Sequence, residues 1–443
     1  MTNSQTPAVR IFDADPPPAR DPVLLRLLAG APPEDGAESL RRHRFRLGAE
    51  WSPEHGEPFI EALRDSGLTG RGGSAFPAWR KWTAVAQHAR NRGAVVVANG
   101  SEGEPASRKD RHLMRLRPHL IIDGLLIAAE KLGARLGVIY LPRDFAVERA
   151  TVLTALRERD DVNRRGRPQI RMVSGPHRYV AGESSAVVSF LNGGEARPQF
   201  ARVRTSEQGV DGLPTLVQNV ETLAHVALIA RRGPTWFRRA GTTGDPGTAL
   251  VTVGGSGRLP AVIEIERGAP LALVAQAAGV DRPRVGPVLV GGYFGTWLNP
   301  TDAWATRLDA EGLASVGAAF GCGSISLLPA DACALVETAA VLAFLARESA
   351  RQCGPCWNGL DAIAATFGRI AAGAGRDDDL ARLTRWADAV ADRGACHHPD
   401  GALMLLRSCL RANAEHVEQH LARGVSCSQR PLLPTPTLTG SWL

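Results

Sequence analysis

Short apolar runs alternate with helical stretches over about residues 50–235 of this chain. The apolar runs predict buried strands, and the stretches between them predict helices. The expected strands are 95–98, 136–141 and 170–173. The expected helices are 77–89, 120–132, 146–157, 184–191 and 217–230. Because strands that alternate with helices are typical of a largely parallel sheet, we assign an α/β domain to residues 46–240.

The pattern changes after residue 246, where short strands are separated by Gly and Pro. Strands at 249–253, 261–266 and 288–290, with a helix at 271–278, predict a small β-grasp domain over 246–296. A glycine-rich connector is expected over 297–330.

From residue 331 the pattern is helical and predicts a helical bundle over 331–425. Its expected helices are 334–347, 355–372, 378–391, 402–410 and 412–422. Residues 426–443 form a Pro-containing tail. At the other end, the Pro- and Arg-rich residues 1–45, with one short apolar segment at 23–28, predict a poorly ordered lead-in and one small helix.

Composition narrows the class of protein. A hydrophobic content of 44% and a charged content of 22% are ordinary for a globular protein, and no apolar run approaches the ~20 residues that span a bilayer. The N-terminus lacks the pattern of a secretory signal. Seven unevenly spread cysteines favour a reducing setting over a disulfide framework. We expect a cytoplasmic protein, either free or peripheral to a membrane complex.

The net charge of +7 is scattered along the chain and carried mostly by arginine. No basic helix with interleaved aromatic residues is present, which argues against nucleic-acid binding. A positive face would suit an acidic redox partner such as a ferredoxin.

A glycine-rich loop at 67–82, G-L-T-G-R-G-G-S-A-F-P-A-W-R-K-W, is the first candidate for chemistry. Glycines let a backbone approach a ligand closely, and a helix N-terminus offers N–H groups to an anion. Arg71 and Lys81 could add charge-assisted bonds to a phosphate. A second polar stretch, N-G-S-E-G-E-P at 99–105, follows a buried strand. Together they indicate a phosphate-bearing cofactor at a strand end, although a glycine-rich loop alone is a weak signal.

Two further blocks, Y-V-A-G-E at 179–183 and P-T-L-V-Q-N-V-E-T at 214–222, complete an ordered set of four. In order and wording, over about residues 50–425, this set resembles the NADH-binding flavoprotein (51 kDa-type) subunit of bacterial complex I and its relatives in NAD-linked formate dehydrogenases and hydrogenases, as a divergent member. The resemblance implies an FMN/NAD(P)-binding α/β domain, a β-grasp domain of the soluble-ligand-binding type (SLBB) and an iron–sulfur-binding-type bundle. It also implies the cofactors FMN, NAD(H) or NADP(H), and a [4Fe–4S] cluster.

The resemblance assigns roles to particular residues. The cofactor-binding residues that it implies are Gly70, Arg71, Gly72, Phe76, Lys81, Asn99, Ser101, Glu102, Tyr179, Gly182, Glu183, Ser184, Gln218, Asn219 and Thr222. Glu104 is expected nearest to the nicotinamide and is the candidate catalytic residue. Three of these positions depart from the family's pattern, because Ser101 and Ser184 replace acidic residues and Gln218 replaces an asparagine.

Two departures concern the nicotinamide nucleotide. The acid replaced by Ser184 helps the family to disfavour NADPH, and the family's K-P-P-F-P stretch becomes A-R-V-R-T at 201–205. Losing an acid and gaining arginines is the direction expected for accepting a 2′-phosphate. We predict relaxed or switched preference toward NADPH, with decay of the nucleotide site as the alternative.

The cysteines show a further departure. The family holds one [4Fe–4S] cluster with C-x-x-C-x-x-C and a later cysteine, and Cys353, Cys356 and Cys396 match the second, third and fourth ligands. Ala350 occupies the first position. Cys396 is followed by His397 and His398. Four outcomes stay open: a three-cysteine cluster with an open or non-cysteine site, a [3Fe–4S] cluster, a histidine substitute, or no cluster. A C-x-x-C pair can also be a redox dithiol or half a zinc site.

The remaining cysteines, Cys322, Cys333, Cys409 and Cys427, are expected to be ordinary thiols. The function that the resemblance implies is an NAD(P)H dehydrogenase subunit, which takes a hydride onto FMN and passes electrons to an iron–sulfur protein or ferredoxin. The alternative is a non-catalytic scaffold subunit with degenerate cofactor sites.

Overall fold

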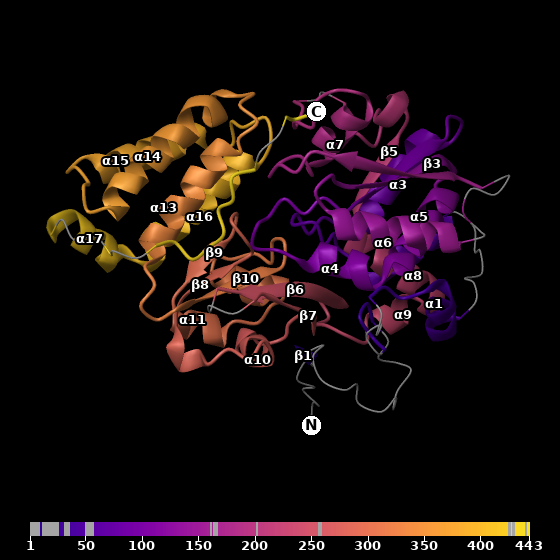
Figure 1. Cartoon of the computed structure of the whole chain (residues 1–443), viewed down its shortest axis with the longest axis horizontal. Helices are drawn as coiled ribbons and strands as arrows, with labels where there is room; N and C mark the ends of the chain where they lie inside the picture. Colours follow the sequence, from indigo (N-terminus) through magenta and orange to yellow (C-terminus); the bar gives the residue numbers. More distant parts are fainter. Residues whose placement is uncertain are drawn as a thin grey trace.

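The computed structural model describes residues 9–10, 26–30, 36–48, 57–159, 162, 167–200, 203–255, 259–423, 427, 430–438 and 441–443. They form three parts: an α/β part with a four-stranded sheet, a six-stranded sheet, and a helical bundle (Figure 1). Each part has a hydrophobic core of its own.

The four-stranded sheet has the order β4-β3-β2-β5, and every pairing is parallel. Its strands are β2 (Ala94–Asn99), β3 (Ala134–Pro142), β4 (Gln169–Gly175) and β5 (Thr215–Asn219). The central strand β2 is apolar from Ala94 to Ala98, as expected for a parallel sheet that is covered on both faces. The predicted α/β domain with a parallel sheet is confirmed.

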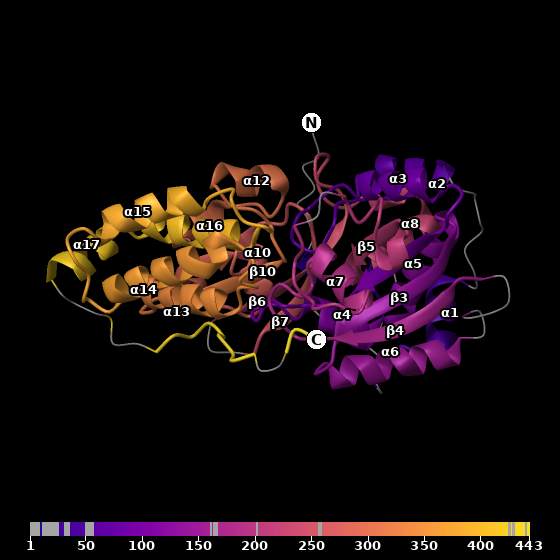
Figure 2. The same ribbon diagram turned by 90° about the horizontal axis from the view of Figure 1, so that it is seen from above.

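Helices surround this sheet on both sides (Figure 2). They are α1 (Leu40–Leu47), α2 (Glu57–Ser66), α3 (Ala78–Ala89), α4 (Lys109–Leu116), α5 (Pro118–Lys131), α6 (Ala146–Glu158), α7 (Ser184–Leu191), α8 (Val220–Arg232) and α9 (Pro234–Phe237). The two most buried helices, α5 and α8, cross closely at Gly124. A Cβ added at Gly124 would lie 2.0 Å from the carbonyl oxygen of Leu223, so only glycine permits this crossing.

The expected helix over 217–230 is wrong at its start. Residues 215–219 are strand β5, and the helix begins at Val220. Residues 215–219 form a strand because they pair with residues 95–99 of β2. This pairing with a strand distant in sequence outweighs the local preference of these residues for a helix. As a result Asn219 lies opposite Asn99 at the ends of adjacent strands.

The six-stranded sheet has the order β1-β7-β6-β10-β8-β9. Its strands are β1 (Val9–Arg10), β6 (Thr248–Gly254), β7 (Ala261–Glu266), β8 (Val285–Val290), β9 (Thr296–Leu298) and β10 (Ser324–Pro329). Three short helices accompany it, α10 (Leu271–Ala277), α11 (Pro300–Ala305) and α12 (Ala310–Ser315). At the centre of the sheet β6 pairs in parallel with β10. The hairpin of β6 and β7 extends the sheet on one side, and the hairpin of β8 and β9 extends it on the other. This is the arrangement of a β-grasp sheet.

The expected connector at 297–330 is therefore wrong. This segment contains the end of β9, helices α11 and α12, and β10, which lies between β6 and β8. The glycines of the segment suggested a loop, but residues 324–328 are buried because β10 fills the centre of the sheet.

The bundle follows the predicted helical pattern. Its helices are α13 (Ala334–Arg347), α14 (Leu360–Ala371), α15 (Asp379–Val390), α16 (His398–Ala412) and α17 (Ala414–Arg423), and a π-helical turn (Pro355–Gly359) precedes α14. The tail runs back from the bundle toward the α/β part, where the C-terminus lies beside α7 (Figures 1 and 2). The Ala196 N–H donates to the carbonyl oxygen of Trp442 at 2.8 Å.

The lead-in is described only in part. Residues 23–25 lie outside the described residues, and residues 26–30 contain a turn whose Leu27 and Leu28 are buried. The helix found in the lead-in is α1, which begins at Leu40. None of the helices in the described part of the chain combines the length and apolar character that crossing a bilayer requires.

Candidate functional site

Three of the four sequence blocks meet at the carboxyl ends of β2 and β5. Asn99 and Asn219 lie opposite each other there. The Asn99 side chain donates from Nδ2 to the carbonyl oxygen of Gly182 at 2.8 Å, which brings the 179–183 block to the same edge of the sheet. In an open parallel sheet this edge is where ligands bind.

The glycine-rich loop joins them as the fourth block. Its ends are held together by a bond from the Gly70 N–H to the carbonyl oxygen of Phe76 at 2.8 Å. The Arg71 N–H donates to Thr222 Oγ1 at 2.9 Å, which fastens the loop to the first turn of α8. A Cβ on Gly72 would lie 3.3 Å from the Cβ of Asn219, so the loop backbone closely approaches the N-terminus of α8.

Much of this loop is open to solvent. Gly72, Ser74 and Ala75 are exposed, and the Phe76 side chain is 41% exposed. The Arg71 side chain is the exception, because it is buried and directed into the protein. It donates to Thr69 Oγ1 at 2.7 Å and to the carbonyl oxygen of Thr248 at 3.1 Å, which ties the loop to β6.

Two side chains at the strand ends have buried polar atoms without a partner among the described residues. They are Ser101 Oγ and Gln218 Oε1. Gln218 lies in β5 beside Asn219, and Ser101 follows the end of β2. A buried polar atom without a hydrogen bond costs about 1–3 kcal/mol, so both atoms fit hydrogen-bonding groups of a ligand.

Lys81 on α3 and Glu183 at the start of α7 lie close enough to influence each other. Burial lowers the pKa of Lys81, and the charge of Glu183 acts in the opposite direction. Glu183 is also the N-cap of α7, where it accepts bonds from the N–H groups of Ser185 at 2.8 Å and Ala186 at 3.2 Å. Ser184 is the first residue of that helix.

Glu102 has a different environment from the one the resemblance suggests. Its carboxylate is buried and accepts bonds from Ser107 Oγ at 2.5 Å and from the N–H groups of Asp110 at 3.1 Å and Arg111 at 3.2 Å. Glu102 thus caps the N-terminus of α4. In the described residues, both of its carboxylate oxygens have protein partners.

Glu104 lies between the α/β part and the six-stranded-sheet part, and the ring of its partner Tyr179 packs against Phe344 and His398 of the bundle. Its carboxylate accepts bonds from Tyr179 Oη at 3.0 Å, from the Tyr293 N–H at 2.8 Å and from the Ala106 N–H at 3.2 Å. Burial raises the pKa of Glu104 to about 7, and the three donors oppose that rise. This carboxyl can therefore hold or release a proton near neutral pH.

A buried ionic network under the site was missed by the sequence reasoning. Lys109 Nζ lies 2.7 Å from Asp110 Oδ1 and 2.8 Å from Glu221 Oε2. Asn219 Nδ2 donates to Asp110 Oδ2 at 2.7 Å, and the Leu250 N–H of β6 donates to Glu221 Oε1 at 2.8 Å. The network thus joins α4, α8 and β6. The available signal was an adjacent Lys-Asp pair shortly after the E-G-E-P block.

The charges in this network stabilise one another. Burial alone would lower the pKa of Lys109, but the charges of Asp110 and Glu221 raise it above its ordinary value. Burial would likewise raise the pKa of Glu221, yet the charge of Lys109 lowers it to about 2. Burial raises the pKa of Asp110 even beside this lysine. The network positions Asn219 at the end of β5.

In the bundle, the three matched cysteines lie near one another. Burial raises the pKa of Cys356 to about 12, a bond from Ser349 opposes the rise, and Cys353 and Cys396 add to it. Burial also raises the pKa of Cys396, with further contributions from Glu183 and Cys353. The charge of Glu183 therefore raises the pKa of both Lys81 and Cys396 relative to what it would be without this neighbour.

The first ligand position has no donor atom. Ala350 is 5% exposed and packs in a small apolar cluster with Val180 and Trp442. The three cysteines supply three thiols, whereas the Ala350 methyl group supplies no ligand atom for a four-thiolate cluster. Of the two histidines that follow Cys396, His397 is exposed, and His398 is buried with Nε2 bonded to the carbonyl oxygen of Leu345 at 2.8 Å.

Residues 348–350, which precede Cys353, are hydrogen-bonded to the 179–183 block and its neighbours. Glu348 lies two residues before Ala350, and its carboxylate accepts bonds from Arg178 Nε at 2.9 Å and from the Tyr179 N–H at 3.2 Å. Arg197 donates to the carbonyl oxygen of Ala350 at 3.4 Å. The segment just before Cys353 therefore lies against residues 178–180, which belong to or adjoin the 179–183 block.

The residues expected to bind the adenosine end of the nucleotide are described in part. Ala201 and Arg202 lie outside the described residues. Val203 and Arg204 are exposed, and the carbonyl oxygen of Thr205 accepts the Thr215 N–H at 2.8 Å, which places this segment beside β5. The preference for NADPH stays a prediction.

Comparison with known proteins gives two family matches. The model of the Nuo51 FMN-binding domain matches residues 63–228. The model of the NADH-ubiquinone oxidoreductase-F iron-sulfur binding region matches residues 337–420. These two ranges contain, respectively, the strand-end blocks and the three cysteines.

Similar proteins carry related names. The chain is 30% identical over 410 residues to the F 2 subunit of NADH-quinone oxidoreductase from Rhizobium meliloti (strain 1021), covering 88% of this chain and 95% of the relative. It is 28% identical over 374 residues to the F subunit of NADH-quinone oxidoreductase from Rickettsia typhi, covering 82% and 88%.

A solved structure shares the fold. A chain of an NAD+-reducing [NiFe]-hydrogenase, solved in the H2-reduced state, superposes with a TM-score of 0.76 at 31% identity. The match covers 82% of the present chain and 62% of the hydrogenase chain.

Proposed function

The chain belongs to the family of 51 kDa-type flavoprotein subunits of NADH-quinone oxidoreductase, and we propose that it oxidises NADH or NADPH with FMN and passes electrons to an iron–sulfur partner. The family is one of oxidoreductases. The observation that carries the proposal is the convergence of all four sequence blocks at the ends of β2 and β5, where Ser101 Oγ and Gln218 Oε1 are buried without a partner among the described residues.

The flavin would be held by groups at this edge of the sheet. The backbone of Gly70 and Gly72, the N-terminus of α8 and the Lys81 ammonium suit its phosphate. Asn99, Ser101 and Gln218 suit its polar ribityl and ring atoms. When bound, FMN supplies the conversion between hydride transfer and single-electron transfer.

The nicotinamide nucleotide would bind on the side of the site that faces the 179–183 block. Glu104 and Tyr179 are held there by their mutual bond, and Glu183 stands at the N-terminus of α7. We propose that Glu104 orients the nicotinamide through its carboxyl group, whose proton is labile near neutral pH. Hydride transfer itself needs no general base in the protein.

Electrons would leave the site toward the bundle. Cys353, Cys356 and Cys396 lie across the 179–183 block from it, and three thiolates can hold an iron–sulfur cluster of three-cysteine type. The positive net charge suits an acidic acceptor such as a ferredoxin or an iron–sulfur subunit. We expect this partnership in the cytoplasm, either free or at a membrane complex.

The test is optical and uses the full chain. Protein prepared anaerobically and reconstituted with FMN is expected to show a flavin spectrum that bleaches on addition of NADH or NADPH, and comparison of the two rates measures the nucleotide preference. An unchanged strong preference for NADH contradicts the predicted NADPH use but leaves the dehydrogenase intact. A colourless protein that takes up no FMN refutes the proposed function and supports a scaffold role.

A further inference from the structure

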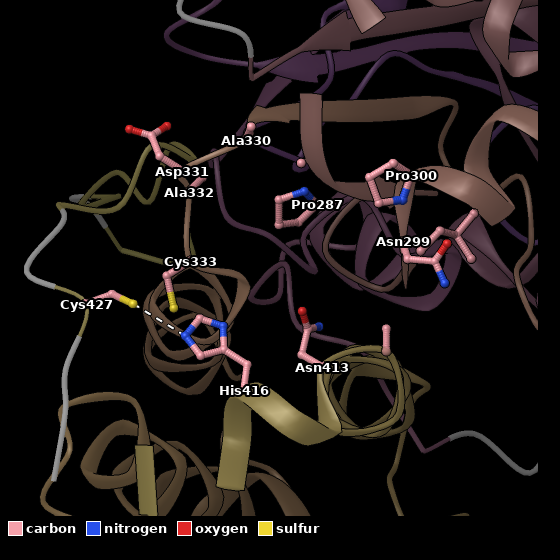
Figure 3. Close-up of a pocket in the computed structure, with 13 residues that line it drawn as sticks. Pro287, Asn299, Pro300, Ala330, Asp331, Ala332, Cys333, Asn413, His416 and Cys427 are labelled. Atoms are coloured by element: carbon pink, nitrogen blue, oxygen red, sulfur yellow. Dashed lines mark hydrogen bonds between the residues drawn. The ribbon is translucent and has the colours of Figure 1, made fainter. Parts of the chain in front are cut away.

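Two cysteines and two histidines of the bundle form a group that the flavoprotein chemistry does not use. The possible ligand atoms of Cys333, His416, His420 and Cys427 all lie within 4.8 Å of one another. We propose that these four residues bind a zinc ion in a structural Cys2His2 site. Figure 3 shows Cys333, His416 and Cys427 with their sulfur and ring atoms turned toward a common point.

Three separate segments contribute the four residues. Cys333 is the N-cap of α13, His416 and His420 lie one turn apart on the same face of α17, and Cys427 follows that helix. The expectation that Cys333 and Cys427 are ordinary thiols is not supported, because each is part of this group. A signal was present in the sequence, since H-x-x-x-H at 416–420 has the histidine spacing of many zinc sites.

The distances match tetrahedral zinc. With zinc–nitrogen bonds of about 2.0–2.1 Å and zinc–sulfur bonds of about 2.3 Å, tetrahedral geometry separates two nitrogens by about 3.3 Å and a sulfur from a nitrogen by about 3.6 Å. His416 Nε2 and His420 Nε2 are 3.1 Å apart. Cys427 Sγ lies 3.4 Å from the first and 3.6 Å from the second.

Hydrogen bonds with neighbouring groups hold the His420 ring and the Cys333 side chain in positions that suit metal binding. His420 is buried, and its Nδ1 lies 3.0 Å from the carbonyl oxygen of Ala371, to which it donates. That bond leaves the lone pair on Nε2, the atom that faces the group, as is usual for a histidine ligand. The backbone N–H groups of Val336 and Leu335 at the start of α13 donate to the Cys333 sulfur, which holds this side chain in place.

The donor set selects the metal and the role. Two thiols and two imidazoles suit zinc and exclude the oxygen-seeking cations magnesium and calcium. Four protein ligands complete a tetrahedron, which is typical of a structural rather than a catalytic site. A cavity of about 310 Å³ lined by Cys333, His416 and Cys427 gives the ion a path of entry.

The site would fasten the beginning of the tail to the bundle. Cys427 follows the last helix, while Cys333 precedes the first. Just beyond Cys427, the N–H groups of Leu432 and Leu433 donate to the Glu337 carboxylate at 2.7 and 2.9 Å. Zinc would close the chain between residues 333 and 427 into a loop that contains every helix of the bundle in the described residues.

Metal analysis of the full-length protein tests this proposal. After loading with zinc chloride and gel filtration, we expect about one zinc per chain, and X-ray absorption is expected to show two sulfur and two nitrogen ligands at about 2.3 and 2.0–2.1 Å. Cys333→Ser and His420→Ala are each expected to abolish stoichiometric zinc. Cys409→Ala is the matched control, because Cys409 is a buried thiol of the same bundle outside the group, and it should retain zinc.

Two results would overturn the proposal. One is wild-type protein that keeps less than about a tenth of an equivalent of zinc after loading. The other is folded Cys333→Ser and His420→Ala protein that keeps as much zinc as wild type, which would mark the ion as adventitious. Should both variants fail to fold, the ligand set from X-ray absorption of the wild type decides. Iron content, measured on the same samples, distinguishes loss of this site from loss of a cluster at Cys353, Cys356 and Cys396.

Discussion

The strand-end site of the α/β part and the three-cysteine group of the bundle have departed from the family's pattern in different ways. At the strand ends the resemblance indicates that one polar side chain has replaced another, as at Ser101 and Gln218, and both have a buried polar atom without a partner among the described residues. In the bundle, the position at which the resemblance places a ligand is occupied by Ala350, whose methyl group packs against Val180 and Trp442. A hydrogen bond can be supplied by several residue types, whereas iron needs a thiolate or a close substitute. The strand-end site can therefore exchange one polar residue for another and still bind its ligand. The three-cysteine group, in contrast, cannot bind the same iron–sulfur cluster after it loses a thiolate.

A cysteine at position 350 would give the bundle a complete set of four thiol ligands, so that both sites would have all the ligand-binding groups they need. Ala350→Cys is expected to raise iron and acid-labile sulfide to about four of each per chain in anaerobically prepared protein, because a fourth thiolate completes the ligand set. Ala350→Ser is the control, since it has nearly the same size and lacks the soft ligand. Iron and sulfide that stay at the wild-type level in Ala350→Cys would show that the missing thiolate is not what limits the cluster.

A substitution in the buried network of Lys109, Asp110 and Glu221 tests how much this network stabilises the protein around the strand-end site. Lys109→Gln leaves the carboxylates of Asp110 and Glu221 buried without their cation, so we expect it to lower the free energy of unfolding by about 3–5 kcal/mol. Chemical denaturation measures the change. Arg80→Ala, on the exposed face of α3, should change stability by less than about 0.5 kcal/mol. Equal effects of the two variants would contradict a role for the network.

Protonation of Glu104 gives the next largest effect. Its pKa is raised from 4.5 to about 7, so the stabilisation that its proton provides is complete below pH 4.5 and is lost as the pH rises through 7. Relative to Glu104→Gln, the wild type should lose up to about 3 kcal/mol of unfolding free energy over that interval. Unfolding curves at several pH values measure the difference. Curves that stay parallel for the two proteins would place the pKa of Glu104 near its ordinary value.

The smallest predicted effect concerns affinity for the flavin. Lys81→Ala removes a cation from the glycine-rich loop, and we expect FMN to bind about tenfold more weakly, a loss of about 1.4 kcal/mol. Arg80→Ala, one residue away and exposed, should bind FMN as wild type does. Fluorescence titration of the flavin-free protein with FMN provides both dissociation constants. Identical affinity for wild type and Lys81→Ala would remove Lys81 from the phosphate site.

The sequence predicted most of what local patterns determine. Continuous apolar runs located β2, β3 and β4, and helical stretches located most of the bundle. Residues 215–219 and β10 were missed because each becomes a strand only by pairing with a strand distant in sequence. Local pattern carries no information on such partners.

For the site residues too, the sequence predicted what depends on local motifs and missed what depends on contacts between distant segments. Block order brought Asn99, Gly182 and Asn219 into one hypothesis, and they do lie together. The capping role of Glu102 and the network of Lys109 could not be read from spacing, because their partners come from the tertiary fold. The Cys333 and Cys427 pair was missed for the same reason, since they meet only when the bundle closes.

The network of Lys109 also bears on how a ligand enters. It joins α4 and α8 to β6, and Arg71 and Arg108 add bonds to Thr248 and Thr252 of the same strand. Breaking these buried bonds together would be costly, so the α/β part and the six-stranded sheet should move as a single rigid body without a hinge between them. The strand-end site beside this junction should then keep its shape while a ligand enters or leaves, without a hinge motion between the two parts.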